Sequence, residues 1–158
     1  PHFKNLIKQN KKITLTDERM TRFWITLDES VKFVNECLKI MKGGEIFIPK
    51  LPSIKIIDLI KAMKNKPKID IIGIRPGEKL YEVMSPNDEV NNTYEFKNYY
   101  LIYPAIRYYN LKNNYSKSAK GEIGKKVRKD FEYSSKNNNK FLSIQEIKKE
   151  LSKLNKNN

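Results

Sequence analysis

The sequence predicts a small α/β or α+β unit, and three observations support that prediction. Apolar runs typical of strands alternate with stretches of helical periodicity through the first half of the chain. A segment rich in tyrosine and phenylalanine follows at residues 92–103 and is expected to be extended. The length of 158 residues is that of one domain, in which residues 1–109 form the main part and residues 110–158 a polar tail that ends in a helix.

The first two predicted helices differ in how clearly their ends are marked. A short helix is expected over residues 3–9, with its apolar side chains on one side. The second begins at a capping box formed by Thr26 and Glu29, and Gly43-Gly44 ends it. Cys37, the only cysteine, falls on its apolar face and is expected to behave as a small buried hydrophobe. The apolar stripe of this helix consists of Leu27, Val31, Val34, Leu38 and Met41.

The other two predicted helices are each expected to begin at a serine. Ser53 is expected to cap the third helix. The fourth begins at a capping box of Ser143 and Glu146, and Leu142 should pack against Ile147 as a hydrophobic staple. Their apolar faces consist of Ile56, Leu59, Ile60 and Met63 in the third helix and Ile144, Ile147, Leu151 and Leu154 in the fourth. Strands are predicted at residues 13–16, 23–26, 45–49 and 69–74, the last of them buried.

Composition argues against a membrane-spanning or disulfide-linked protein and leaves a nucleic-acid-binding or interaction module open. The longest apolar runs fall well short of the roughly 18 residues that a membrane-spanning helix needs. A single cysteine permits no internal disulfide and fits a reducing cytoplasm. The net charge of +14 would suit a nucleic-acid-binding or interaction module. Only 5 of the 32 basic residues are arginines, and the lysines are spread along the chain, so we disfavour this alternative without discarding it.

The stretch from Gly73 to Glu82 contains the most informative motif. Arg75 is a permanently charged fork suited to phosphate oxygens, and Pro76-Gly77 predicts a tight turn at the end of a strand. Glu78 is then close enough to accept a hydrogen bond from a neighbouring sugar hydroxyl. A second arginine, Arg22, comes just before the strand expected at residues 23–26. Two arginines and a carboxylate at strand ends suit a nucleotide diphosphate.

Several segments resemble the C-terminal half of extended short-chain dehydrogenases/reductases. They include MTRFWIT at residues 20–26, GGEIFIPK at residues 43–50 and GIRPGEKLYE at residues 73–82. The strongest resemblance is to the inverting UDP-N-acetylglucosamine 4,6-dehydratases. Residues 92–96, 131–135 and 141–143 resemble the tail of the same family.

This resemblance implies a function for a larger enzyme. NADP would take a hydride from sugar C4, water would be eliminated across C5 and C6, and the hydride would return to C6. The product, a UDP-4-keto-6-deoxy sugar, would feed surface-glycan or flagellin glycosylation in the cytoplasm. In this chain, Arg22 and Arg75 would hold the pyrophosphate, Glu78 the ribose and Phe3 the uracil. The resemblance also implies a homo-oligomer.

The residues of hydride transfer are expected outside this chain. The sequence has no glycine-rich dinucleotide fingerprint, so a Rossmann half that binds NADP is expected upstream of Pro1. Tyr108 and Lys112 have Tyr-x-x-x-Lys spacing, and Tyr133 has lysines nearby, but neither tyrosine lies in the family's catalytic context. We predict no catalytic residue and no metal site here, and expect the isolated chain to be inactive. A UDP-sugar 4-epimerase of capsule synthesis remains the alternative within the superfamily.

Overall fold

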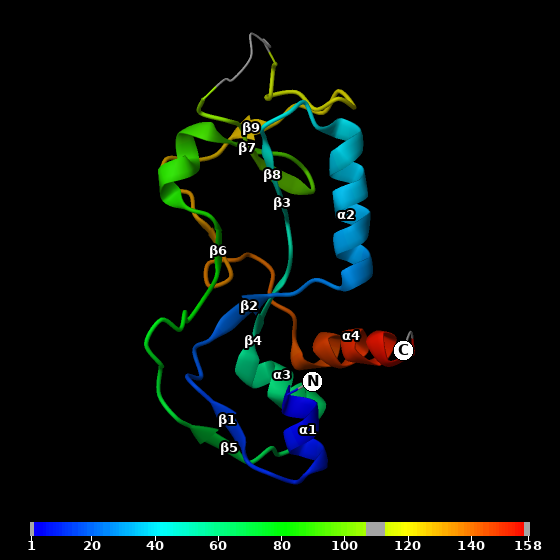
Figure 1. The fold of residues 1–158 in the computed structure, drawn as a ribbon, viewed down its shortest axis with the longest axis vertical. Coiled ribbons are helices and arrows are strands. Elements are labelled where there is room, and N and C mark those ends of the chain that lie inside the picture. The colour runs from blue at the N-terminus through cyan, green and yellow to red at the C-terminus, as the bar shows by residue number, and fades with distance from the viewer. Residues whose placement is uncertain (1, 107–112, 157–158) are drawn as a thin grey trace. The chain divides into compact units, whose positions relative to one another are not determined.

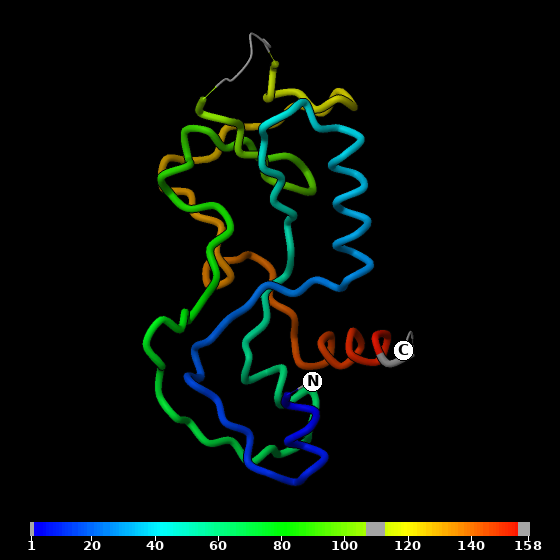
Figure 2. The backbone as a smooth tube through the Cα atoms, in the orientation of Figure 1, coloured from blue at the N-terminus to red at the C-terminus, as the bar shows by residue number. Residues whose placement is uncertain are grey.

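The computed structural model describes residues 2–106 and 113–156, and it divides into two compact units. Unit 1 comprises Pro1–Trp24, Pro52–Glu82 and Asn138–Asn158. Unit 2 comprises Ile25–Leu51 and Val83–Asn137. Figure 1 shows the elements, and Figure 2 traces how the chain passes back and forth between the units. The domain boundary expected at residues 109 and 110 lies outside the described residues.

Unit 1 contains three helices and two short strand pairs. Strand β1 pairs in parallel with β5, and β2 pairs antiparallel with β4. Helices α3 and α4 pack against each other. The elements are α1 (His2–Lys8), β1 (Ile13–Leu15), β2 (Thr21–Phe23), β4 (Ser53–Lys55), α3 (Ile56–Met63), β5 (Ile69–Ile71) and α4 (Ile144–Lys156).

Two aliphatic clusters stabilise unit 1. The first is built on Ile13 and Ile60, which are 1% and 0% exposed, and side chains of α1 and α3 pack against it. The second joins Ile54 of β4 to Leu142 and Ile147 beside and within α4. Because α3 contributes side chains to both clusters, it connects the β1–β5 pair to the C-terminal helix.

Unit 2 is built around an antiparallel sheet in the order β3-β8-β7-β9. A separate antiparallel pair joins β6 and β10. The core is aromatic: Phe96 and Tyr99 stack with their ring centroids 4.7 Å apart, and Phe47 packs on Tyr99. The elements are α2 (Leu27–Ile40), β3 (Ile46–Pro49), β6 (Val83–Ser85), η1 (Asn87–Asn92), β7 (Thr93–Glu95), β8 (Tyr99–Ile102), β9 (Lys125–Lys126) and β10 (Tyr133–Ser134).

Both capping boxes predicted from the sequence are confirmed. The Thr26 hydroxyl accepts a bond from the Glu29 amide, and the Glu29 carboxylate accepts one from the Thr26 amide. Ser143 and Glu146 make the same reciprocal pair at the start of α4. Local side-chain chemistry therefore fixes where α2 and α4 begin.

Three expectations about unit 1 are wrong in detail. Ser53 does not cap a helix; it lies in β4, and α3 begins three residues later without a side-chain cap. Strand β2 ends at Phe23, so Arg22 lies inside the strand and not before it. Strand β5 covers only Ile69–Ile71 and is largely exposed: Ile69 packs against the first cluster, whereas Asp70 and Ile71 are exposed.

Helix α2 has two apolar faces, and only one of them is packed. Phe33 and Ile40 on the inner face pack against the aromatic cluster. Cys37 is half-buried, and burial raises the pKa of its thiol to about 11. The outer face is exposed and consists of Leu27 (77%), Val31 (53%), Val34 (55%), Leu38 (62%) and Met41 (51%). The stripe predicted from helical spacing is therefore real, but no described residue covers it.

The polar tail is shared between the units. Residues 113–137 complete unit 2, where β9 pairs with β7 and β10 with β6. Residues from Asn138 onward return to unit 1, and Leu142 donates its amide hydrogen to the carbonyl of Ser53 at 2.9 Å. Among the described helices, none combines the length and apolar content that crossing a membrane would require.

Candidate functional site

The candidate site is the turn at Arg75, which β5 presents in unit 1. The amide of Ile72 donates to the Leu15 carbonyl at 3.0 Å, so the β1–β5 pairing continues one residue past the strand. The amide of Glu78 then donates to the Arg75 carbonyl at 3.0 Å and closes a four-residue turn. Gly77 has φ +80°, which a type II turn requires at its third residue. The predicted tight turn is thus present.

Glu78 is hydrogen-bonded on both carboxylate oxygens. Its Oε2 accepts the backbone amide of Arg75 at 3.3 Å, and its Oε1 accepts the Thr16 hydroxyl at 2.9 Å. Thr16 directly follows β1. The carboxylate therefore ties the turn to the end of the neighbouring strand.

Arg22 lies against the other end of the same loop. Its guanidinium donates to the carbonyls of Lys79 at 3.0 Å, Leu80 at 3.2 Å and Thr21 at 2.7 Å. Its Nε lies 3.7 Å from the Glu82 carboxylate, which also accepts the Phe23 amide at 3.2 Å. Three of the five N–H groups of Arg22 are thus used to hold β2 and the loop together.

Arg75 contrasts with Arg22, because its side chain is exposed and its guanidinium has no hydrogen-bond or ion-pair partner among the described residues. The salt bridge to Glu78 or Glu82 that a purely structural role would predict is not formed. A permanently charged fork without a partner, on a turn whose backbone is fixed, is available to an anion.

Phe3 lies in the core of unit 1. Its half-buried ring packs against the aliphatic cluster of Ile13 and Ile60, and Leu80 packs against the same cluster. The structure therefore brings Arg22, Arg75 and Glu78 together around the segment 75–82. Phe3 is joined to them only through the cluster that also anchors Leu80.

The acidic residues near the site are not arranged as a proton donor. Two hydrogen bonds from the Arg19 guanidinium and one from its amide hold the pKa of Asp17 near 2. Glu18 is exposed, whereas Asp17 is half-buried in its pair with Arg19. Asp17 is ionised at neutral pH and shapes the turn into β2.

Of the two tyrosines considered for hydride transfer, Tyr133 lies in the described residues and its hydroxyl is bonded to the backbone. The hydroxyl of Tyr133 donates to the Leu51 carbonyl at 3.1 Å and accepts the Leu51 amide at 2.7 Å. Burial raises the pKa of Tyr133 above its ordinary value. Its hydroxyl is thus committed to the backbone. Tyr108 and Lys112 lie outside the described residues.

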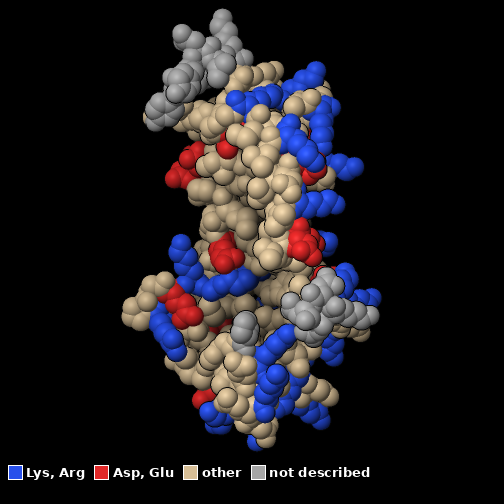
Figure 3. All heavy atoms as spheres, turned by 45° about the vertical axis from the view of Figure 1, so that its right-hand side comes forward, with Lys and Arg blue, Asp and Glu red and all other residues tan. Residues whose placement is uncertain are grey.

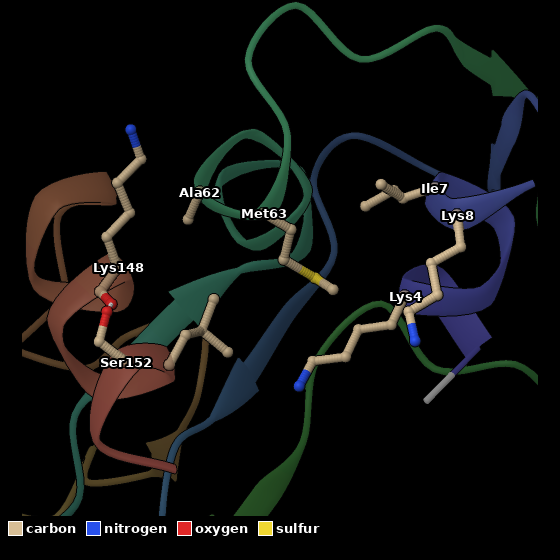
Figure 4. Close-up of a pocket in the computed structure, with 8 residues that line it drawn as sticks. Lys4, Ile7, Lys8, Ala62, Met63, Lys148 and Ser152 are labelled. Atoms are coloured by element: carbon tan, nitrogen blue, oxygen red, sulfur yellow. Dashed lines mark hydrogen bonds between the residues drawn. The ribbon is translucent and has the colours of Figure 1, made fainter. Parts of the chain in front are cut away.

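A hollow of about 420 Å³ in unit 1 lies between α1, α3 and α4. Figure 4 shows Met63 and Lys4 pointing into it, whereas Lys148 extends away. Its wall combines apolar side chains with three lysines and a serine, and no carboxylate or histidine lines it. The hollow lacks groups for acid–base chemistry, so it is a weaker candidate than the Arg75 turn.

On the face that Figure 3 shows, the basic charge does not gather into one surface. On the face shown in Figure 3, Lys and Arg form separate groups interspersed with acidic and uncharged residues. Several lysines are paired locally, for example Lys39 and Lys120 with Glu36, whose pKa their hydrogen bonds lower to about 2. This arrangement does not favour the nucleic-acid alternative, which needs a continuous basic track.

One residue of this network, Thr16, was missed at the sequence level. Thr16 is 62 positions from Glu78, and nothing local to a single threonine predicts their contact. Glu82 lies four residues after Glu78 in the same motif, and its carboxylate supports the structure by accepting an amide of β2.

Comparisons with known proteins show which proteins this chain is similar to. Residues 1–104 match the family described as polysaccharide biosynthesis protein. A UDP-N-acetylglucosamine 4,6-dehydratase (inverting) of Campylobacter jejuni is 50% identical over 148 residues, which are 93% of this chain and 44% of the relative. A UDP-glucose 4-epimerase of Rickettsia bellii is 37% identical over 152 residues, which are 94% of this chain and 43% of that protein.

A solved structure agrees with these matches. The X-ray structure of Pen from Bacillus thuringiensis has a TM-score of 0.75 and 33% identity to this chain. The match covers 98% of this chain and 45% of that one. The chain thus spans less than half the length of the relatives that it matches. Together these matches confirm the family resemblance and the fold class predicted from the sequence.

Proposed function

Because the chain belongs to the family of polysaccharide biosynthesis proteins, we propose that it forms the nucleotide-sugar-binding part of an inverting UDP-N-acetylglucosamine 4,6-dehydratase. The observation that carries this proposal is the Arg75 turn, whose backbone is fixed while the guanidinium has no partner in the part of the chain that the structure describes. The 50% identity to the Campylobacter dehydratase supports the choice of substrate.

Two of the proposed contacts, those of Arg75 and Glu78, use a capacity that the structure leaves open. Arg75 binds the diphosphate through two parallel N–H groups. Glu78 accepts a ribose hydroxyl, since a carboxylate has about four acceptor positions and two are used. Arg22 adds positive charge beside the second phosphate, and Phe3 lies toward the uracil end. Binding energy from UDP then orients the sugar for reaction.

NADP does not fit the residues of this chain. A dinucleotide site needs a glycine-rich turn between a strand and the helix that follows it. Helix α2 follows β2, and α3 follows β4, with no glycine between them. The six glycines lie instead after α2, around the Arg75 turn and at residues 121 and 124. We therefore assign NADP and the hydride-transfer residues to the part of the enzyme outside this chain.

The uncovered face of unit 2 suggests where that other part docks. The outer face of α2 exposes five large apolar side chains, and β3 pairs only with β8 among the described strands. An exposed apolar stripe and an open sheet edge both favour a protein partner. We assign them to the nucleotide-binding half, which is the remaining length of the relatives. The proposed homo-oligomer would form on the assembled enzyme.

Calorimetric titrations of UDP and NADP into the 158-residue chain test this proposal. UDP should bind, and NADP should not compete with it. Incubation of the chain with UDP-N-acetylglucosamine and NADP should yield no 4-keto sugar by mass spectrometry. The absence of UDP binding, or turnover clearly above a blank, would overturn the assignment.

A UDP-glucose 4-epimerase remains the second candidate, because the Rickettsia relatives match nearly the whole chain. The same UDP-binding turn would serve either reaction. With the nucleotide-binding half supplied, a dehydratase makes a 4-keto-6-deoxy product two hydrogens and one oxygen lighter than the substrate. An epimerase leaves the mass unchanged, so the product mass separates the two. A dehydratase product would suit surface-glycan or flagellin glycosylation.

A further inference from the structure

The Arg75 turn is held from both sides by side chains that do not belong to it. On one side the Thr16 hydroxyl bonds to the Glu78 carboxylate, which in turn accepts the Arg75 amide. On the other side Arg22 bonds to the carbonyls of Lys79 and Leu80. The chain between these attachments is the turn itself.

We propose that Thr16 and Arg22 are positioning residues, which fix the Arg75 turn in the shape that receives the diphosphate. The choice of ligand rests on the proposed function, whereas the positioning rests only on the contacts within this chain. Thr16 acts through Glu78, and Arg22 acts through the loop backbone that leaves the turn.

The geometry of Arg22 favours this role over that of a second free charge. Its side chain is 28% exposed, and it donates to the Thr21 carbonyl of β2 and to two carbonyls of the loop after the turn, those of Lys79 and Leu80. A planar fork can bridge several carbonyls at once, whereas a lysine ammonium is a single point. Arg22→Lys therefore keeps the charge but loses the bridge.

The role of Thr16 is separated from its packing by a matched pair of variants. Thr16→Val removes the hydroxyl and keeps the shape, and Thr16→Ser restores the hydroxyl. Thr14 lies two residues earlier, exposed in β1, and makes no side-chain hydrogen bond among the described residues. Thr14→Val is thus the control for changing a threonine of this strand.

Amide hydrogen exchange of the ¹⁵N-labelled 158-residue chain measures the order of the turn without any ligand. In Thr16→Val, the amides of Arg75 and Glu78 should exchange about tenfold faster, because a bond to a charged group is lost. Thr16→Ser should restore the slow exchange, and Thr14→Val should not change it. In Arg22→Lys, the Thr21 amide, which donates to Leu80, should exchange faster as well.

UDP affinity supplies the second readout. It should fall about three- to tenfold in Thr16→Val, although no charge is removed, and the salt dependence of binding should stay the same. Unchanged exchange at Arg75 and Glu78 in Thr16→Val would overturn the positioning role of Thr16. If amide exchange and UDP affinity were both unchanged in Arg22→Lys, Arg22 would instead act on the diphosphate directly through its charge. If the wild-type chain bound no UDP, the proposed function would fail, and the exchange data would still decide the positioning.

Discussion

Units 1 and 2 differ in the kind of group that each leaves without a partner. Unit 1 packs aliphatic side chains in two clusters and presents Arg75, which has no partner among the described residues, on a fixed turn. Unit 2 leaves an apolar face of α2 exposed. A small anion can satisfy the first deficiency, whereas only a protein surface can satisfy the second. This difference supports the proposal that unit 1 binds the ligand and unit 2 docks the nucleotide-binding half.

The cores of the two units are also held differently. Unit 1 relies mainly on isoleucine and leucine. Unit 2 relies on stacked aromatic rings with cations above them, for example Lys126 at 4.3 Å from the Tyr94 ring centroid and 4.7 Å from that of Tyr103. Substitutions in the two units should therefore affect different measurements.

Removing the free charge of unit 1 should have the largest effect. Arg75→Ala should weaken UDP binding by about 1.5–3 kcal/mol, because a charge-assisted hydrogen-bond pair is lost. Arg75→Lys should recover only part of this, because an ammonium cannot make the bidentate contact. Arg128→Ala, at an exposed ion pair of unit 2, is the matched control and should leave UDP binding unchanged. Equal losses in both variants would show that only net charge matters.

Overpacking the core of unit 2 should affect stability and leave the site intact. A Cβ at Gly124 would lie 2.6 Å from the buried Phe96 ring, which cannot move freely. Gly124→Ala should therefore lower the free energy of unfolding by about 1–3 kcal/mol, measured by urea denaturation. UDP binding below the transition should persist. Loss of UDP binding with full stability would contradict the separation of roles.

Substitutions at two glycines with similar positive φ angles compare the Arg75 turn with a loop of unit 2. Gly77 and Gly121 have φ of +80° and +87°, and a Cβ at either would meet no atom within 4 Å. Alanine should cost about 1–2 kcal/mol of backbone strain at each position. Gly77→Ala should also weaken UDP binding by distorting the Arg75 turn, whereas Gly121→Ala should not. Calorimetry on both variants tests this, and equal UDP affinities would contradict the importance of the turn.

The smallest effect on stability is expected on the outer face of α2. Leu38 is 62% exposed, so Leu38→Gln should change the free energy of unfolding by no more than about 0.5 kcal/mol. It should nevertheless reduce self-association of the chain, measured by light scattering, because an apolar patch is interrupted. Ile40→Ala, on the packed inner face, is the control and should lower Tm instead. A chain that is already monodisperse would contradict the assembly role.

The sequence predicted the helices more accurately than the strands, and the reason is the range of the interactions. Thr26 with Glu29 and Ser143 with Glu146 are contacts three residues apart, so the sequence alone locates them. Strand limits depend on partners far along the chain. Strand β2 ends at Phe23, which pairs with Ser53, the first residue of β4. This pairing overrode the capping preference of Ser53. The exposure of α2 depends on the absence of a covering surface, which no helical period can reveal.

The candidate site was predicted in part. Arg75, Pro76-Gly77 and Glu78 were recognisable because the turn and its charges are adjacent in sequence. The contact between Thr16 and Glu78 was not, because β1 and β5 meet only in the folded unit. The different surroundings of Arg22 and Arg75 were likewise invisible, since both are simply arginines near strand ends.

Hydrogen-exchange mass spectrometry of the chain with and without UDP is the most direct test of the central claim. UDP should slow exchange in residues 73–82 and in β2 of unit 1, and leave the sheet and α2 of unit 2 unchanged. NADP at the same concentration should protect neither unit. Protection by UDP in unit 2 alone, or protection of residues 73–82 by NADP and not by UDP, would contradict the assignment of the Arg75 turn to the sugar nucleotide.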